Sequence, residues 1–458
     1  MPNDNKLSVV ILAAGLGTRM KSRRAKVLHE LGGLPLITHV VRTTNELDPE
    51  TILVVVGHQA EEVENAVLEA VGDKASFVVQ EKQRGTGDAV ESTRSLLENS
   101  DSLILLLYGD MPLVRAGTLK KLIEHHRETG ATCSILSVEM QNPTGYGRIV
   151  RSEDGSFARI VEQRDATADQ RQIREINSGI YCFEARDLFQ ALRQVQPAND
   201  QGEYYLTDVA EILLSLGGTV SVYLHDDSRE VSGINTRAEL AEIENLVRRN
   251  TIRRLMTENG VTFIDPSHAY ISPEAQVGSD CIIYPDVSIE GKSVIGEGCV
   301  IRSGVRITNS HIGNDVTVKD HSIIVDSEIG SHCSVGPFAH LRMNATLEDK
   351  ATVGNFVEVK KSRLKRGTKA MHLTYLGDAT IGERTNIGAG TVTCNYDGKN
   401  KHETIIEEDV KIGSDTMLVA PVRVGARSMT GAGSVVTKDV PPDCLVAGVP
   451  AEVKKKLK

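Results

Sequence analysis

An apolar residue returns at every sixth position through most of the C-terminal half of the chain. The register resumes after each slip, and many of the repeating residues are followed directly by glycine. A period of six fits neither an α-helix nor an alternating β-strand. It is typical of a hexapeptide β-helix, in which short strands turn corners and each aliphatic residue points inward. The repeating positions are Val277, Ile283, Ile289, Ile295, Ile301, Ile307, then Ile312, Val318, Ile324, then Ile329, Val335, Leu341, Leu347, Val353, Val359, and later Ile381, Ile387, Ile406, Ile412, Leu418 and Val424.

The N-terminal half follows a different pattern. Apolar runs of strand length alternate with stretches of helical periodicity. This alternation predicts an α/β domain with a mostly parallel sheet covered by helices. The expected strands are Ser8–Ala13, Thr51–Val56, Phe77–Val79 and Leu103–Leu107, and the expected helices are Ile37–Leu47, Ala60–Val71 and Thr86–Leu97.

A connecting helix is predicted between the two halves. Thr236 and Glu239 have the spacing of a capping box, and apolar residues follow at roughly helical intervals until Gly260. We therefore expect an α/β domain at residues 1–234, a helix at 235–259 and a repeat domain at 260–458.

Charge and cysteine content narrow the class of protein. The formal net charge of -10 argues against nucleic-acid binding, because phosphate backbones attract basic surfaces. No apolar run approaches membrane-spanning length, and the opening residues lack the pattern of a secretory signal. The seven cysteines are scattered without a Cys-x-x-Cys pair, which predicts reduced thiols in a cytoplasmic protein.

A loop of small residues directly follows the first expected strand. It reads Leu12-Ala13-Ala14-Gly15-Leu16-Gly17-Thr18-Arg19-Met20, and Lys26 comes soon after. Small residues let a nucleotide approach the backbone, and backbone N–H groups can bind its phosphates. Arg19 and Lys26 add positive charge suited to a triphosphate. The loop has neither the Gly-x-Gly-x-x-Gly motif of dinucleotide binders nor a Walker lysine, which disfavours both classes.

Four further motifs accompany this loop. Tyr108-Gly109-Asp110 ends the strand Leu103–Leu107 and places a carboxylate where ligands of open α/β sheets bind. Gln80 precedes Gly85-Thr86-Gly87, a segment that can contact a base and open a helix. The remaining two are Gly147 with Glu162 and Asn177, and Asn235 directly before the connecting helix.

Together these motifs resemble the nucleotidyltransferase half of the bifunctional N-acetylglucosamine-1-phosphate uridyltransferase/glucosamine-1-phosphate acetyltransferase family, and the resemblance extends through both halves of the chain. It implies a Rossmann-like domain in which Asp110 and Asn235 hold Mg²⁺, an ion that prefers oxygen ligands. It also implies that Arg19 and Lys26 assist catalysis by neutralising charge. The implied contacts to UTP and to the sugar nucleotide are Leu12, Ala13, Ala14, Gly15, Lys26, Tyr108, Gly109, Asp110 and Asn235, with Gln80, Gly85 and Thr86 at the uracil and Gly147, Glu162 and Asn177 at the sugar.

The repeats resemble the left-handed parallel β-helix of acyltransferases, which are typically trimers with active sites between neighbouring coils. The resemblance implies that His372 is the general base acting on the glucosamine amine, and imidazole suits this role because it titrates near neutrality. A basic run in an acidic protein agrees with a phosphorylated substrate. The implied contacts are Arg342 and Lys360 at the sugar phosphate, Tyr375, Asn386, Asn395 and Tyr396 at the sugar, and Ala389, Ser414 and Ala432 at acetyl-CoA.

The tail departs from the pattern of some family members. They carry an arginine near the end that contacts the coenzyme, whereas this chain reads Ala447-Gly-Val-Pro450 there. The nearby basic segment Lys454–Lys456 is a candidate substitute.

The implied function is the two-step synthesis of UDP-N-acetylglucosamine from small molecules by a homotrimer. One alternative is a single-function sugar-1-phosphate nucleotidyltransferase whose β-helix serves only structure, trimerisation or regulation. The segments His372–Tyr375 and Asn395–Gly398 argue against it, because a purely structural coil does not need them. Another alternative is a zinc hydratase on the same coil, which needs three histidines that converge between subunits. The histidines His311, His321, His332 and His340 are not spaced by whole coils consistently, which disfavours it.

Overall fold

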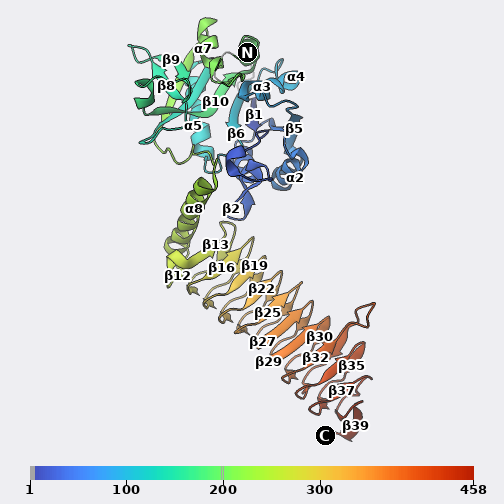
Figure 1. The fold of residues 1–458 in the computed structure, drawn as a ribbon. Helices are drawn as coiled ribbons and strands as arrows, with labels where there is room; N and C mark the ends of the chain where they lie inside the picture. The colour runs from blue at the N-terminus through green and yellow to red at the C-terminus, as the bar shows by residue number, and fades with distance from the viewer. Residues whose placement is uncertain (1–5, 198, 200, 458) are drawn as a thin grey trace. The chain divides into compact units, whose positions relative to one another are not determined.

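The computed structural model describes residues 6–197, 199 and 201–457. The chain divides into two compact units, residues 1–243 and 244–458 (Figure 1). Within the described residues, no helix combines the length and the apolar character needed to cross a membrane. All seven cysteines lie in this part of the chain and are free thiols.

The first unit is built on a nine-stranded sheet. Its centre is parallel, in the order β6 (Leu103–Tyr108), β1 (Leu7–Leu12), β4 (Thr51–Val56) and β5 (Ala75–Val79). Beyond β6, strand β10 (Glu175–Glu184) runs antiparallel to both β6 and β7 (Cys133–Glu139), and β11 (Val220–His225) pairs parallel with β7. A hairpin of β8 (Arg148–Arg151) and β9 (Phe157–Val161) pairs with β10, and β2 (Glu30–Leu31) and β3 (Leu34–Pro35) form a separate two-stranded ribbon. The expected strands are therefore present, and the sheet is mixed at β10.

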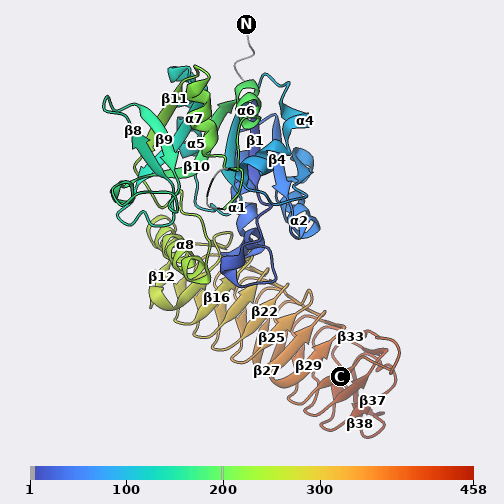
Figure 2. The same ribbon diagram turned by 45° about the horizontal axis from the view of Figure 1, so that its top comes forward.

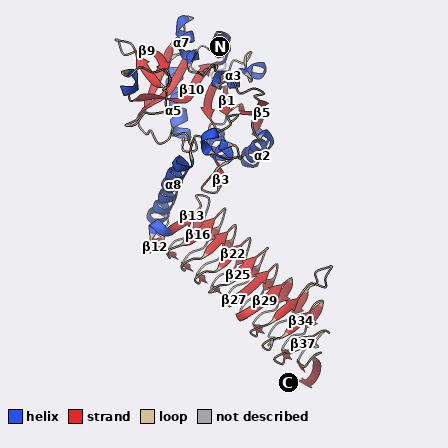
Figure 3. Ribbon diagram, in the orientation of Figure 1, coloured by secondary structure: helices blue, strands red, loops and turns tan. Residues whose placement is uncertain are grey.

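Both faces of this sheet are covered by helices (Figure 3). Side chains of β1 alternate between two cores, because successive residues of a strand point to opposite faces. Val9 and Ile11 belong to one core, and Val10 and Leu12 belong to the other. The first core is covered by α1 (Leu36–Asn45), α2 (Ala60–Val71) and α5 (Ala116–Thr129), and the second by α3 (Thr86–Glu91), α4 (Arg94–Leu97), α6 (Ala185–Leu192) and α7 (Asp208–Ser215).

The helix expected at Thr86–Leu97 is divided into α3 and α4. Ser92 Oγ donates a hydrogen bond to the carbonyl of Ala89 at 2.6 Å, and Thr93 Oγ1 donates one to the carbonyl of Val90 at 2.7 Å. Hydroxyl groups that bond nearby carbonyls compete with the helical ladder. The prediction of one continuous helix was wrong at this point for that reason.

The connecting helix α8 spans Arg237–Glu258 and has the expected capping box. Thr236 Oγ1 accepts a hydrogen bond from the Glu239 N–H at 3.2 Å, and Glu239 Oε2 accepts one from the Thr236 N–H at 3.1 Å. The helix ends just before Gly260, which has a φ of +70°. Near its end, Ile252 and Leu255 are buried in the core of the second unit.

The second unit is a parallel β-helix with three sides to each coil (Figures 1 and 2). Two sides share the long strands β27 (Thr352–Lys360) and β29 (Lys369–Gly377), which run across the corner between them. Every hexapeptide position named above is buried in one continuous core, so the prediction of inward-pointing repeats is confirmed. The first side contains β12 (Thr262–Phe263), β15 (Ile282–Ile283), β18 (Val300–Ile301), β21 (Thr317–Val318), β24 (Ser334–Val335) and β31 (Asn386–Ile387); the second contains β13 (Ala269–Ile271), β16 (Val287–Glu290), β19 (Arg306–Thr308), β22 (Ile323–Val325), β25 (His340–Arg342), β32 (Val392–Cys394), β34 (Met417–Val419) and β37 (Val435–Val436); the third contains β14 (Gln276–Val277), β17 (Val294–Ile295), β20 (His311–Ile312), β23 (Glu328–Ile329), β26 (Thr346–Leu347), β28 (Arg363–Leu364), β30 (Ala379–Ile381), β33 (Thr404–Ile406) and β35 (Val422–Val424). The coil closes with β36 (Met429–Thr430), β38 (Cys444–Ala447) and β39 (Glu452–Lys456).

The slips in the six-residue register are short corners. The corner after Ile307 turns at Asn309, which has a φ of +44°, and the following Ser310 Oγ donates to the carbonyl of Thr308 at 2.8 Å. The next slip has the same construction, with Asp326 at a φ of +44° and a Ser327 Oγ bond of 2.7 Å to the carbonyl of Val325. A left-handed residue followed by serine therefore turns the chain with one residue fewer, and the stacking of the sides continues.

Candidate active sites

A cavity of about 420 Å³ opens at the carboxyl ends of β1 and β6. The loop after β1 forms one wall, and Tyr108 and Asp110 at the end of β6 form another. These strands are parallel neighbours, so the segments that follow them meet at the same edge of the sheet. The Gly109 N–H donates to the carbonyl of Leu12 at 3.0 Å and fixes the two walls together. The residues expected at the nucleotide that line this cavity are Leu12, Ala13, Ala14, Gly15, Lys26, Gln80, Gly85, Thr86, Tyr108 and Asp110.

Two oxygen ligands converge on one cationic group in this site. Lys26 Nζ donates to Asp110 Oδ2 and, at 3.2 Å, to Asn235 Oδ1. Arg19 Nη2 donates to the same Asn235 oxygen at 2.8 Å. A carboxylate and an amide oxygen that meet at a point of positive charge are the donor set that suits Mg²⁺. Among the described residues no group of three His, Cys, Asp or Glu side chains gathers to hold a metal, so these two oxygens would be only part of the shell of an ion bound here.

The segment expected to contact the uracil base is held in a fixed conformation by hydrogen bonds. Gln80 Nε2 donates to the carbonyl of Gly85 at 3.2 Å and to Asp88 Oδ2 at 2.9 Å. Gly85 has a φ of +114°, and a Cβ there would lie 2.5 Å from the carbonyl oxygen of Tyr204. Glycine is therefore required at this position. The Thr86 hydroxyl accepts a hydrogen bond from the Leu206 N–H at 3.1 Å, which anchors the start of α3.

The residues expected at the sugar lie together on the strands beyond β6. The Asn177 N–H donates to the carbonyl of Gly147 at 2.9 Å. A Cβ on Gly147 would lie 3.3 Å from Glu162 Oε1, so this glycine keeps space beside the carboxylate. Burial raises the pKa of Glu162, and a hydrogen bond from Thr207 partly opposes that rise. Burial also raises the pKa of Tyr108, and the nearby Glu162 charge adds to the rise.

In the second unit, His372 and Asn355 form a pair across neighbouring coils. Their strands β29 and β27 are parallel, and the two residues occupy the same register position. His372 Nδ1 lies 2.9 Å from Asn355 Oδ1. Because the amide oxygen can only accept, Nδ1 carries the proton and Nε2 carries the lone pair. The structure thus presents an imidazole in the tautomer that a general base needs.

The residues expected at the sugar phosphate follow the same strands. Arg342 pairs in register with Lys360, and Arg342 Nε donates to Glu358 Oε1 at 2.8 Å. The Lys360 side chain is buried, with only 8% of its surface exposed, and its Nζ lies 4.0 Å from Asp378 Oδ2. A buried ammonium paired with one carboxylate is suited to bind a phosphate that displaces part of that pairing.

The same Asp378 contacts Asn395, one of the residues expected at the sugar ring. Asn395 Nδ2 donates to Asp378 Oδ2 at 2.5 Å and lies 3.5 Å from Tyr375 Oη. The neighbouring Tyr396 is exposed and lies on a loop that leaves the coil.

The three positions expected at acetyl-CoA lie on successive coils. The carbonyl of Ala389 accepts a hydrogen bond from the Asp415 N–H at 2.7 Å, next to Ser414. The carbonyl of Ser414 accepts one from the Gly433 N–H at 2.8 Å, next to Ala432. Asn386 belongs to a parallel column, because it pairs with Lys369 on one side and bridges on the other to Lys411, which bridges to Met429. The coil thus aligns these residues in a strip that an extended coenzyme can follow.

The basic tail lies on the same strip. Lys455 and Lys456 of β39 line a cavity of about 650 Å³ together with Lys411, Arg427 and Met429. Lys454 forms an ion pair with Glu452 at 3.3 Å. Lys455 and Lys456 are therefore next to the column that contains Lys411 and Met429.

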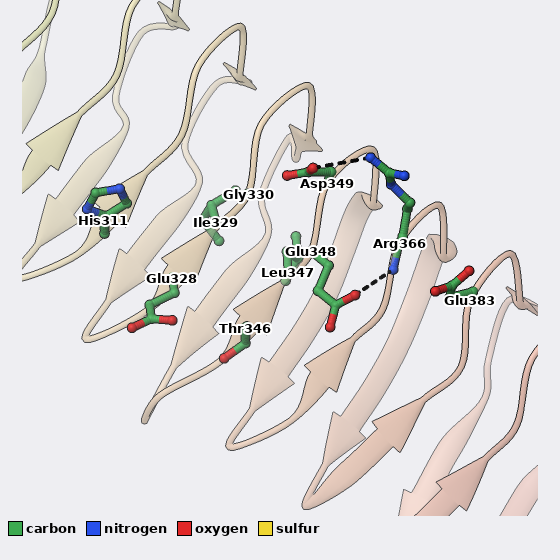
Figure 4. Close-up of a pocket in the computed structure, with 10 residues that line it drawn as sticks. All are labelled: His311, Glu328, Ile329, Gly330, Thr346, Leu347, Glu348, Asp349, Arg366 and Glu383. Carbon is green, nitrogen blue, oxygen red and sulfur yellow. Dashed lines mark hydrogen bonds and ion pairs between the residues drawn. The ribbon is translucent and has the colours of Figure 1, made fainter.

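Another groove on the coil, of about 620 Å³, contains none of the residues expected at the substrates (Figure 4). Two of its acidic side chains contact Arg366. Glu348 accepts a hydrogen bond from the Arg366 N–H at 3.2 Å, and Asp349 pairs with the Arg366 guanidinium at 3.5 Å. His311 lines this groove on another coil beside Glu328, its neighbour in the strand register. Within one chain, no group of three metal-binding side chains gathers among the described residues.

Sequence reasoning missed several partners of the expected residues. Asn355, Glu358 and Asp378 lie near expected residues in the sequence, but their roles depend on which residues face each other on neighbouring coils. In the first unit, Asp88 holds Gln80 and was also missed. One signal was available for Asp88. It follows Arg84 by four residues, a spacing that favours the ion pair that the two side chains form.

Comparisons with known proteins agree with both units. The MobA-like NTP transferase domain matches residues 9–211, the GMPPB C-terminal domain matches residues 266–355, and the bacterial transferase hexapeptide (six repeats) matches residues 403–438. Proteins named bifunctional protein GlmU are similar over nearly the whole chain. That of Syntrophomonas wolfei subsp. wolfei is 48% identical over 96% of this chain and 97% of its own length. That of Heliobacterium modesticaldum is 48% identical over 96% of this chain and 95% of its own, and that of Geobacillus sp. is 46% identical over 98% and 97%. This chain therefore belongs to the family of the bifunctional GlmU proteins.

Proposed function

We propose that this chain makes UDP-N-acetylglucosamine in two steps at two separate sites. Acetyl transfer to glucosamine-1-phosphate takes place on the coil at residues 260–458. Uridylyl transfer to N-acetylglucosamine-1-phosphate takes place in the domain at residues 1–234, and the helix at 235–259 connects them. The observation that carries the proposal is the His372–Asn355 pair, because a coil that served only structure has no need of an oriented imidazole.

In the first step, His372 Nε2 takes a proton from the sugar amine as the amine nitrogen attacks the thioester carbonyl of acetyl-CoA. The C–N bond forms, the C–S bond breaks, and the proton held by His372 passes to the coenzyme thiolate, which leaves as the free thiol. Arg342 and Lys360 bind the sugar phosphate, and Tyr375, Asn386, Asn395 and Tyr396 orient the ring. A backbone N–H near Ala389 stabilises the oxyanion, and Ser414 and Ala432 line the path of the coenzyme.

In the second step, a phosphate oxygen of N-acetylglucosamine-1-phosphate attacks the α-phosphorus of UTP. One P–O bond forms, one breaks, and pyrophosphate leaves without a covalent protein intermediate. Asp110 and Asn235 would hold Mg²⁺, which offsets charge on the phosphate oxygens when bound. Lys26 and Arg19 already lie at the same point and supply positive charge to the triphosphate.

We further propose a homotrimer in the cytoplasm. An exposed apolar ladder on the coil supports self-association, since His321 stacks on Phe338 at 5.2 Å and Phe338 stacks on Phe356 at 5.4 Å. Leu373 continues the same corner and is 63% exposed. An exposed apolar row of this kind is typical of a surface that another chain covers.

The test measures thiol release and pyrophosphate release separately in the presence of glucosamine-1-phosphate, acetyl-CoA, UTP and Mg²⁺. His372→Ala should stop thiol release and still form pyrophosphate from supplied N-acetylglucosamine-1-phosphate. Asp110→Ala should do the reverse. If the unaltered protein forms pyrophosphate but releases no thiol with any sugar phosphate, the coil is structural or regulatory and the two-step proposal is wrong.

A further inference from the structure

A buried carboxylate lies in the chain segment that leads to Asn235, one of the proposed metal ligands. Glu230, in the loop between β11 and α8, is 4% exposed. Its Oε2 accepts a hydrogen bond from the Thr118 hydroxyl at 2.6 Å and one from the Arg115 N–H at 3.3 Å. Its Oε1 lies 3.4 Å from the Arg115 guanidinium. The functional assignment leaves this carboxylate without a role.

The groups around Glu230 come from two separate elements. Arg115 and Thr118 form the start of α5, where a negative charge is stabilised by the unpaired N–H groups of the first turn. His225, the last residue of β11, lies with its Nε2 3.6 Å from Glu230 Oε1. Glu230 therefore ties its own loop to the first turn of α5, and the charge it buries there is paired.

Each of the two segments that Glu230 joins leads along the chain to one of the proposed metal ligands. The chain that enters α5 comes from Asp110, and the chain that leaves Glu230 reaches Asn235. Along this course the Ile234 N–H donates to the carbonyl of Asp110 at 3.0 Å. Gly233 lies against the Asp110 carboxylate, since a Cβ there would be 3.7 Å from both of its oxygens. The two segments thus run side by side from the Glu230 contact to the ligand pair.

We propose that Glu230 is a positioning residue that sets the distance between the Asp110 and Asn235 oxygens. The inference rests on the proposed uridylyl transfer, in which these two oxygens hold Mg²⁺. The sheet holds one end of each loop that carries a proposed ligand: Asp110 follows β6, and the loop that reaches Asn235 begins after β11. Glu230 joins the two loops away from the sheet through its charged contact with Arg115. Groups that orient metal ligands from behind change metal affinity when they are removed.

The experiment measures divalent-cation affinity directly in the full-length protein with UTP, by the electron paramagnetic resonance signal of free Mn²⁺. Glu230→Ala should raise the Mn²⁺ dissociation constant about tenfold, the lower end of the range for groups behind metal ligands. Thr118→Val removes one hydroxyl from the contact and should raise the constant by a smaller factor. Glu230→Gln keeps an oxygen that can accept from Thr118 and should recover part of the loss. Glu98→Ala removes a carboxylate that pairs with Arg94 elsewhere in the same domain and should leave the constant unchanged.

The outcomes separate this inference from the function on which it rests. If Glu230→Ala lowers thermal stability but leaves the Mn²⁺ constant within twofold of the unaltered protein, Glu230 is a helix cap and the inference is overturned. If Asp110→Ala also leaves the constant unchanged, the proposed metal ligands themselves are wrong. Should Glu230→Ala fail to fold, Thr118→Val decides the question. Thiol release by the coil in each preparation confirms that the rest of the protein is intact.

Discussion

His372 Nδ1 and Asn355 Oδ1 lie 2.9 Å apart, and the two residues occupy matching positions on neighbouring coils. The contact joins strands β27 and β29, which make one of the most extended pairings in the coil. Because both backbones are held by this ladder, the imidazole is oriented by the coil itself. Its tautomer is set by an uncharged acceptor, so the ring stays available to take a proton.

Replacing this acceptor tests its role. Asn355→Ala should lower kcat for acetyl transfer about tenfold, a part of the roughly 10²- to 10⁴-fold that a general base supplies, with little change in KM. Asn355→Asp should keep the hydrogen bond but place a negative charge beside the ring, which favours the protonated imidazole. The acid limb of the pH–rate profile should then move to higher pH. Uridylyl transfer by the same variants serves as the control and should be unchanged; an unmoved acid limb contradicts the assignment of His372 as the base.

Glu162→Gln should change stability in a pH-dependent way. Burial raises the pKa of Glu162 in the folded state above its ordinary value of 4.5, so the unfolded chain loses this proton at lower pH than the folded chain does. The carboxylate therefore begins to cost folding free energy as the pH rises through 4.5, and the cost is complete above the folded pKa. Near pH 8 the amide variant should melt about 3 °C higher in the N-terminal unit. Below about pH 4 the difference should vanish, because both states are protonated; calorimetry across this range checks the sign.

The same variant should lose function while it gains stability. Glu162 lies beside Gly147, and both are proposed to hold the sugar. KM for N-acetylglucosamine-1-phosphate should rise, and KM for UTP should stay near that of the unaltered protein. An equal rise in both constants would place Glu162 outside the sugar site.

Two glycines of the nucleotide site should respond differently to alanine. At Gly85 the added Cβ would lie 2.5 Å from the Tyr204 carbonyl oxygen, and the φ of +114° adds strain. Gly85→Ala should lower both the melting temperature and the affinity for UTP. At Gly15 a Cβ meets no atom within 4 Å, so Gly15→Ala should keep its stability and lose UTP affinity alone, because the methyl group occupies the approach of the phosphates. Equilibrium binding of UTP and thermal melting, measured on both variants, distinguish the two effects.

The six-residue period explains why the buried positions of the coil could be predicted from the sequence. Each hexapeptide position reports burial independently, so residues such as Ile301 and Ile412 could be identified without knowledge of their neighbours. The capping box at Thr236 was equally local. These features depend on a few consecutive residues, so they can be recognised in the sequence without knowledge of the tertiary structure.

Contacts between distant segments were the part that could not be predicted. The corner at Asn309 removes one residue from a coil, so the partner of any residue depends on every corner before it. For that reason Asn355 could not be recognised as the partner of His372. The contact of Glu230 with Thr118 joins residues separated by much of the domain, and no spacing rule links them. The antiparallel direction of β10 could not be predicted for a related reason. The sequence of a buried apolar strand does not indicate whether its neighbours are parallel or antiparallel.

The exposed apolar ladder leads to the last prediction, which concerns self-association. Phe338 and Phe356 are 49% and 56% exposed, and both have left-handed backbones, with φ of +53° and +57°. This conformation costs a bulky residue about 1–2 kcal/mol, and glycine occupies the same corner on an adjacent coil at Gly390. Exposure of these rings to water is unfavourable in an isolated chain, and burial against other copies would offset it. Asparagine tolerates the left-handed region and removes the ring.

Phe338→Asn combined with Phe356→Asn should therefore convert the proposed trimer to monomers in sedimentation experiments without lowering the melting temperature of the coil. Acetyl transfer should fall with the loss of the trimer, because Leu373 on the same ladder directly follows His372, whereas uridylyl transfer should continue. Tyr270→Ser is the matched control, since Tyr270 is 58% exposed on the coil and packs under Arg248 at 4.9 Å. If the double variant still sediments as a trimer, the copies meet through another face of the coil, and the exposure of Phe338 and Phe356 needs a different explanation.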